Sequence, residues 1–166
     1  MNVTCKNDIL LKLLNNFFKS NQSYLNKFLD IYYGRSNISL RIIDWFVTNY
    51  SKTNKIYYDI NGNNFIVHLD YKSQLKAYTK KQFDPFCRRE RMNFYYAEKK
   101  FIKTTIGQLN FFKWAFENNI IDYIEKNIND IESHMTIEFK EKKNNLNIKA
   151  KKTINKHNVK ITVSFD

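Results

Sequence analysis

Apolar residues in the N-terminal part of the chain recur at helical spacing. Between residues 7 and 19 they return every three or four positions, which predicts an amphipathic helix. Residues 23–33 repeat the pattern, and Gly34 follows as a stop signal. Residues 39–50 (SLRIIDWFVTNY) predict a mostly buried helix, with a strand as the alternative because several of these residues are β-branched.

The clearest hairpin pattern covers residues 55–71, where Asn61-Gly62 is a strong turn signal between two alternating runs. Side chains alternate across a strand, so one face of the hairpin should be apolar and buried. The predicted buried face consists of Ile56, Tyr58, Ile60, Phe65, Val67 and Leu69. The predicted opposite face consists of Tyr57, Asp59, Ile66, His68 and Asp70.

The C-terminal half predicts two further helices and then strands. Thr105 and Gln108 have capping-box spacing at the start of a helix that breaks near Asn118-Asn119. Residues 120–133 continue with helical spacing, whereas residues 136–142, 146–152 and 159–165 alternate as strands. The chain is therefore predicted to be α+β: N-terminal helices, a central antiparallel β-hairpin, further helices and C-terminal antiparallel strands. We expect one domain over residues 1–166.

Composition excludes several classes of protein. Of the 166 residues, 43% are hydrophobic and 16% aromatic, which argues against disorder. The polar start MNVTCKND predicts no signal peptide, and no apolar run approaches the roughly 20 residues of a membrane span. We therefore expect a protein that is not secreted and has no membrane partner. Cys5 and Cys87 have no disulfide or zinc spacing, which favours a reducing compartment.

Positive charge gathers in residues 72–96, KSQLKAYTKKQFDPFCRRERMNFYY. The seven cations of this segment, against Asp84 and Glu90, are Lys72, Lys76, Lys80, Lys81, Arg88, Arg89 and Arg91. Such cations can neutralise phosphates, and Tyr78 or Phe86 can stack on bases, so we predict a nucleic-acid site on these nine residues. Asp84-Pro85 predicts that the cations lie on an ordered bend. The alternative is a solvated charged surface over core aromatics.

The net charge of +12 is weaker evidence, because AT-rich codons also enrich lysine. AT-rich codons do not enrich arginine, so the prediction of a nucleic-acid site depends mainly on Arg88, Arg89 and Arg91. A second basic zone consists of Lys140, Lys142, Lys143, Lys149, Lys151, Lys152 and Lys156. Here the favoured interpretation is that lysines block aggregation at the edge of a predicted strand.

Catalytic patterns are weak, and we assign no catalytic residue, metal ligand or cofactor. Glu138-x-Lys140 and Asp70-x-Lys72 would share a strand face, as in metal-dependent nucleases of the PD-(D/E)xK type. His68 could pair with Asp70 on a strand, and Cys87 beside arginines could be a nucleophile. A strand histidine and a buried free cysteine are the favoured interpretations. The prediction is a protein that is not an enzyme.

Three segments together resemble small basic proteins of nucleocytoplasmic large DNA viruses, the giant viruses of amoebae. They are LRIIDWFVTNYSKTNKIYY (40–58), YKSQLKAYTKKQFDPFCRRERMNF (71–94) and TTIGQLNFFKWAFENNIIDYI (104–124), and the AT-biased composition agrees with a mimivirus-like genome. The resemblance implies an unsettled function, packaging of some members in virions and no transferable catalytic residues. It also implies a location in the virion and in the host cytoplasm (viral factory) or nucleus.

The leading hypothesis is a viral protein that binds nucleic acid, DNA first, without strong sequence specificity, in genome packaging or early gene expression. The alternative from a different class is a virion structural or interaction protein, with a homodimer as one form. A metal-dependent nuclease is the third hypothesis.

Overall fold

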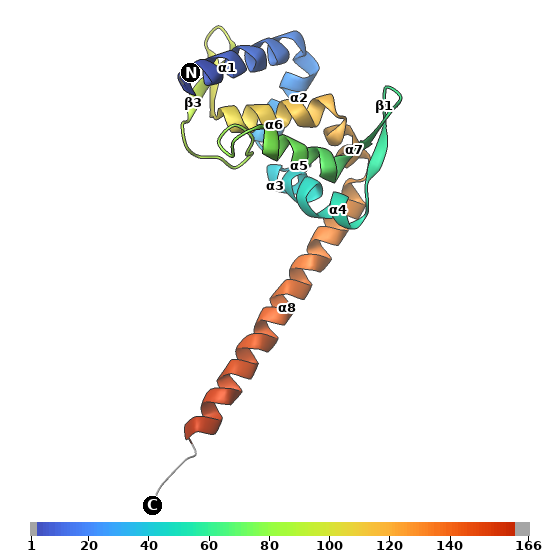
Figure 1. Ribbon diagram of the computed structural model, residues 1–166, viewed down its shortest axis with the longest axis vertical. Helices are drawn as coiled ribbons and strands as arrows, with labels where there is room; N and C mark the ends of the chain where they lie inside the picture. The colour runs from blue at the N-terminus through green and yellow to red at the C-terminus, as the bar shows by residue number, and fades with distance from the viewer. Residues whose placement is uncertain (1–2, 162–166) are drawn as a thin grey trace, which may run out of the picture. The chain divides into compact units, whose positions relative to one another are not determined.

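A computed structural model describes residues 3–161 of the protein, with side chains for residues 6–150. Two hairpins of antiparallel strands are interspersed among helices, which confirms the α+β class (Figure 1). The elements are α1 (Val3–Ser20), α2 (Gln22–Tyr32), α3 (Leu40–Trp45), η1 (Phe46–Tyr50), α4 (Ser51–Thr53), β1 (Tyr57–Ile60), β2 (Asn63–Ile66), α5 (Val67–Ala77), β3 (Met92–Ala97), β4 (Lys100–Thr104), α6 (Ile106–Glu117), α7 (Ile120–Lys126) and α8 (Ile128–Ile161).

The chain divides into two compact units, which in the described residues are 3–128 and 129–161. In its described part the second unit is helix α8 from its second residue onward. That residues 1–166 act as one domain stays a prediction. None of the described helices combines the length and the apolar character needed to cross a membrane.

Aromatic side chains build the core of the first unit. Phe18 of α1 is fully buried, and its ring centroid lies 5.4 Å from Phe28 of α2 and 5.9 Å from Phe94 of β3. Phe28 in turn lies 4.7 Å from Phe112 of α6. Ring pairs at such distances contribute about 0.5–1.5 kcal/mol each beyond the area they bury. The apolar stripes predicted for the first two helices therefore meet on α6.

The helices predicted in the first 133 residues are confirmed, with sharper boundaries. The Ser39 hydroxyl accepts a hydrogen bond from Ile42 N at 3.2 Å, which caps α3, and the helical path continues through the π-helix η1. The Thr105 hydroxyl accepts from Gln108 N at 3.1 Å and caps α6. The Gln108 side chain bonds elsewhere, so only this half of the predicted capping box is present.

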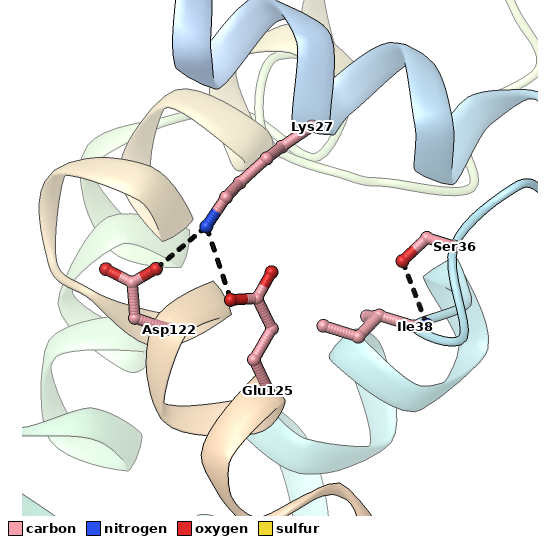
Figure 2. Close-up of polar contacts among 5 residues, drawn as sticks. All are labelled: Lys27, Ser36, Ile38, Asp122 and Glu125. Atoms are coloured by element: carbon pink, nitrogen blue, oxygen red, sulfur yellow. Dashed lines mark hydrogen bonds and ion pairs between the residues drawn. The ribbon is translucent and has the colours of Figure 1, made fainter.

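Lys27 connects α2 to α7, two helices far apart in sequence (Figure 2). Its Nζ donates to Asp122 Oδ1 at 3.1 Å and to Glu125 Oε2 at 3.2 Å. Burial alone would lower the pKa of Lys27, but the hydrogen bonds and charges of both carboxylates outweigh it and raise this pKa.

The predicted hairpin is confirmed in its first half. Asn61 and Gly62 both have positive φ (51° and 82°) and join Ile60 to its partner Asn63 through a two-residue loop. Tyr58 and Phe65 pair across the strands on the predicted inner face, where they are half-buried and not fully buried. The second strand ends at Ile66, however, five residues before the predicted end of the hairpin at Tyr71.

Residues 67–71 are helical, so the prediction of a strand there is wrong. Val67 begins α5 and is fully buried, whereas Leu69, predicted on the same buried face, is 56% exposed. A helix turns about 200° over two residues, so Val67 and Leu69 cannot face the same way. The alternating run was too short to separate the two periods.

The predicted C-terminal strands are also wrong, because residues 136–152 lie in the long helix α8. Glutamate and lysine, which favour helices, fill this region, and no glycine or proline interrupts it after Gly107. The predicted strand 159–165 falls partly on α8, which ends at Ile161, and its other residues lie outside the described part of the chain.

A second hairpin, β3–β4, was not predicted. Phe94 and Ile102 pair across it and are buried. Its turn at Glu98-Lys99 carries no glycine, proline, asparagine or aspartate, so the usual turn signal was missing.

Asp44→Asn should raise the melting temperature near pH 7 by about 2 °C. Burial, helped by the nearby charge of Asp84, raises the pKa of the Asp44 carboxyl on α3. The folded protein therefore keeps this proton to a higher pH than the unfolded chain does. The free energy of unfolding of wild type therefore decreases as the pH rises from the ordinary carboxyl pKa of the unfolded chain through the raised pKa of the folded protein.

An asparagine cannot ionise, so the gain of Asp44→Asn should shrink as the pH is lowered to 4 and more of Asp44 becomes protonated in wild type. Thermal unfolding followed by circular dichroism at both pH values checks this. An unchanged gain at pH 4 would show that packing, and not charge, is responsible.

Candidate nucleic-acid interface

All seven predicted phosphate-binding cations are exposed. Lys72 lies in the middle of α5, and Lys76 lies in its last turn. The other five lie on the irregular segment of residues 78–91 between α5 and β3, which we call the basic loop; they are Lys80, Lys81, Arg88, Arg89 and Arg91. The predicted site thus covers the second half of one helix and the loop that follows it.

Phe83 anchors the basic loop in the core. Its buried ring lies 5.6 Å from Phe111 and 5.6 Å from Trp114, both on α6. Tyr78, predicted to stack on a base, is half-buried and stacks on Phe83 with ring centroids 6.1 Å apart and planes at 18°. Tyr78 is therefore the less accessible of the two predicted stacking rings.

Backbone atoms of the basic loop are also held by α6. Asn110 Nδ2 donates to Gln82 O at 2.9 Å, and Gln108 Nε2 donates to Pro85 O at 3.3 Å. Gly107 allows this approach, since a Cβ there would lie 2.7 Å from Lys81 O. These contacts give the loop a defined path over the start of α6.

The predicted bend at Asp84-Pro85 is confirmed. Asp84 Oδ1 accepts a hydrogen bond from Phe86 N at 2.9 Å, and Cys87 N donates to Asp84 O at 3.3 Å. The aspartate thereby closes a turn with its own side chain. Phe86 lies on this turn with 48% of its surface exposed, so it is free to meet a ligand.

Arg88, Arg89 and Arg91 follow the bend, and within residues 6–150 their side chains form no ion pair. Lys81 differs, because its Nζ lies 3.2 Å from Glu90 Oε1. Both of those side chains are more than half exposed, and such pairs contribute only about 0–1 kcal/mol. The positive charge of the three arginines is therefore available to an anionic partner.

A cavity of about 460 Å³ lies beside the basic loop. Three cations line it, Lys6 of α1 together with Lys81 and Arg89, against one carboxylate, Glu90. Its other polar lining residues are Asn7, Thr79, Gln82 and Thr105. The Gln82 side chain bridges to α1, since its Nε2 donates to Asn7 Oδ1 at 2.9 Å. Its cationic lining suits an anionic group such as phosphate.

The sequence did not reveal Lys6 as a partner of the basic loop. Lys6 lies on the polar side of an ordinary amphipathic helix, far before the basic segment. Packing of α1 against α6, which also holds the loop, brings these cations to one cavity.

The two acid–lysine pairs do not have the geometry predicted for a nuclease. Asp70 and Lys72 lie on α5, and Glu138 and Lys140 lie on α8, so positions two apart point in different directions. Asp70 Oδ2 instead accepts a hydrogen bond from Trp114 Nε1 at 2.6 Å. The premise of strand-borne pairs is wrong, and the nuclease hypothesis loses its geometric support.

His68 and Asp70 do not share a strand face either, because both lie on α5. His68 Nδ1 lies 3.5 Å from Val47 O, and Nε2 is buried with no hydrogen-bond partner among the described residues. Cys87 is half-buried, with its Sγ 3.7 Å from Arg89 O. None of these contacts assembles a nucleophile with a base.

The lysines of the C-terminal zone lie on α8, so the prediction that they protect a strand edge is wrong. Lys140, Lys142, Lys143 and Lys149 are exposed, and Lys142 forms an ion pair with Glu138 one turn earlier. The other three lysines of the zone, Lys151, Lys152 and Lys156, are helical by backbone.

Comparison with known proteins agrees with the resemblance to giant-virus proteins. A model of a family of unknown function, DUF7197, matches residues 2–164. An uncharacterized protein, L507, of Acanthamoeba polyphaga mimivirus is 45% identical over 141 residues, which cover 78% of this chain. The match covers 54% of L507, so the chain spans about half the length of that relative. No solved structure matches.

Proposed function

The chain belongs to DUF7197, a family of unknown function, and we therefore propose a function from its own side chains: it binds nucleic acid, DNA in the first place, without strong sequence specificity. The role would be in genome packaging or early gene expression of a large DNA virus. The corresponding locations are the virion and the host cytoplasm (viral factory) or nucleus.

One observation carries this proposal: Arg88, Arg89 and Arg91 are exposed and form no ion pair within residues 6–150, on a loop whose path is held by α6. Each guanidinium presents a planar fork of donors that matches a phosphate. Because the loop is already ordered, binding has less backbone entropy to remove.

The arrangement favours contacts with phosphates over contacts with base edges. The arginines lie on an irregular loop, and Lys6, Lys81 and Arg89 line one cavity together. Phosphate contacts position a protein on nucleic acid but carry no sequence information. Binding should therefore be strong at low salt and similar for different sequences.

The test is the triple variant Arg88→Ala, Arg89→Ala, Arg91→Ala. Its affinity for a 20-base-pair duplex should fall about tenfold or more near 100 mM salt, measured by fluorescence anisotropy. The slope of log K against log salt should become shallower by up to about 3, because each lost phosphate contact releases roughly 0.9 fewer counterions.

The matched control is Lys140→Ala, Lys142→Ala, Lys143→Ala, which removes the same charge from the exposed surface of α8. A local site predicts a much larger loss for the arginine variant. Equal losses would indicate a general charge effect. If wild type does not bind near 100 mM salt, or the arginine variant binds as wild type does, the proposal fails.

A second candidate function, a virion structural or interaction protein, is favoured by the apolar side chains that α8 exposes. Ile137, Leu146 and Ile148 are each more than half exposed. Sedimentation equilibrium distinguishes the two candidates. A stable homo-oligomer whose mass is unaffected by DNA, together with no DNA binding, would support this second function.

A further inference from the structure

The outward face of the β3–β4 hairpin carries two aromatic rings that the core does not use. The inward face is buried through Phe94 and Ile102, which pair across the strands. One step along, Tyr95 and Phe101 pair on the outward face and are 53% and 43% exposed. Their ring centroids lie 5.2 Å apart, so they form one apolar platform.

Polar and cationic side chains continue this platform. Asn93 pairs with Lys103 on the same outward face, two residues before Tyr95 and two after Phe101. Two residues of strand span roughly 7 Å, so the platform and this pair are neighbours. Arg91 joins them, because Arg91, Met92, Asn93 and Lys103 line a hollow of about 330 Å³.

We propose that this face of β3–β4 binds single-stranded nucleic acid, with bases stacked on Tyr95 and Phe101 and phosphates held by Arg91 and Lys103. The inference rests on the proposed function and deepens it by naming the form of nucleic acid bound. Rings can stack only on bases whose faces are open, which a duplex does not offer. Arg91 also ends the basic loop, so the two surfaces adjoin.

Charge complementarity favours nucleic acid as the ligand of the outward face of β3–β4. The hairpin adds Lys99 and Lys100 at its turn, against Glu98 alone. The other hairpin provides a comparison: its strands β1 and β2 bear an exposed aromatic–aliphatic pair, Tyr57 and Ile66, beside Asp59, and they contain no cation. Exposed rings without cations do not attract a polyanion, so the two hairpins should behave differently.

The experiment uses the full chain with oligo(dT) and with a duplex of equal length, in fluorescence anisotropy near 100 mM salt. The variant Tyr95→Leu, Phe101→Leu keeps an apolar outward face but has no ring to stack. Its affinity for oligo(dT) should fall about tenfold or more, since each stacked base contributes roughly 5- to 150-fold. Duplex affinity and the salt slope should not change, because no cation is lost.

The matched control is Tyr57→Leu, Ile66→Leu on the other hairpin, which should bind oligo(dT) as wild type does. Thermal unfolding within about 2 °C of wild type shows that both variants fold. The second variant Lys103→Ala should weaken oligo(dT) binding and make its salt slope shallower by about 0.7.

If the leucine variant binds oligo(dT) as wild type does while the arginine triple variant loses affinity for both probes, this inference is wrong and the proposed function stands. If wild type binds neither probe, both are wrong. A leucine variant that keeps oligo(dT) affinity but changes the sedimentation mass would show that the face contacts protein instead.

Discussion

Val67→Asp should lower the free energy of unfolding by about 3 kcal/mol or more. Val67 is fully buried, and a carboxylate there would lose its hydration without gaining a partner. Val67 is also the first residue of α5, where a negative charge is favourable by about 0.3–1 kcal/mol. That gain is too small to offset the cost of burial. Urea unfolding followed by tryptophan fluorescence measures the difference.

Leu69→Asp is the informative control, because the strand and the helix predict opposite results for it. On a strand, position 69 would be as buried as position 67, whereas on α5 it is 56% exposed. We therefore expect a loss of about 1 kcal/mol or less for Leu69→Asp. Asp59→Asn should also be nearly neutral, since Asp59 is exposed and its Oδ1 accepts from Gly62 N as an amide oxygen can. If the substitutions at positions 67 and 69 lowered the free energy of unfolding equally, the result would support a strand at these positions.

Gly107→Ala should destabilise the protein by about 1–3 kcal/mol, contrary to the usual effect of this substitution in a helix. Alanine favours a helix over glycine by up to about 1 kcal/mol, and Gly107 lies in the first turn of α6. A Cβ at this position, however, would lie 2.7 Å from Lys81 O and 3.1 Å from Asp84 N. Both atoms belong to the backbone, so the basic loop itself must move.

The same substitution tests whether the position of the loop matters for binding. If the arginines act from a held loop, Gly107→Ala should weaken duplex binding without removing any charge, and the salt slope should stay near that of wild type. Gly34→Ala gives a comparison, because its Cβ would meet no atom within 4 Å although its φ of 71° is strained. Gly34→Ala should lose stability but keep DNA affinity. A fully stable Gly107→Ala protein would contradict the close approach.

Local patterns in the sequence determined most of the first unit. The apolar period predicted α1, α2, the helical run from Leu40 and α6, because burial on one side requires that spacing. Asn61-Gly62 determined the turn of the first hairpin, since both positions need positive φ. The sequence also predicted the threonine cap of α6, the start of α3 at Ser39 and the bend at Asp84-Pro85. Each of these features depends on contacts within four residues.

Other local patterns were misleading where two periods fit the same short run. Val67 is fully buried on α5, and it would also have been buried on the predicted strand. Its apolar character therefore could not distinguish a helix from a strand. Along residues 136–152 the alternation was real, but the helix preference of the glutamates and lysines prevailed. Because these residues do not form a strand, the interpretation that their lysines protect a strand edge is wrong as well.

The tertiary structure alone decided how the candidate site is assembled. The sequence determined which cations lie near one another on the chain, from Lys72 to Arg91. It did not determine that Lys6 joins Lys81 and Arg89 at one cavity, or that Tyr95 and Phe101 point outward while Tyr78 packs on Phe83. Those outcomes depend on contacts between residues distant in sequence, which side-chain packing specifies and local periodicity does not record.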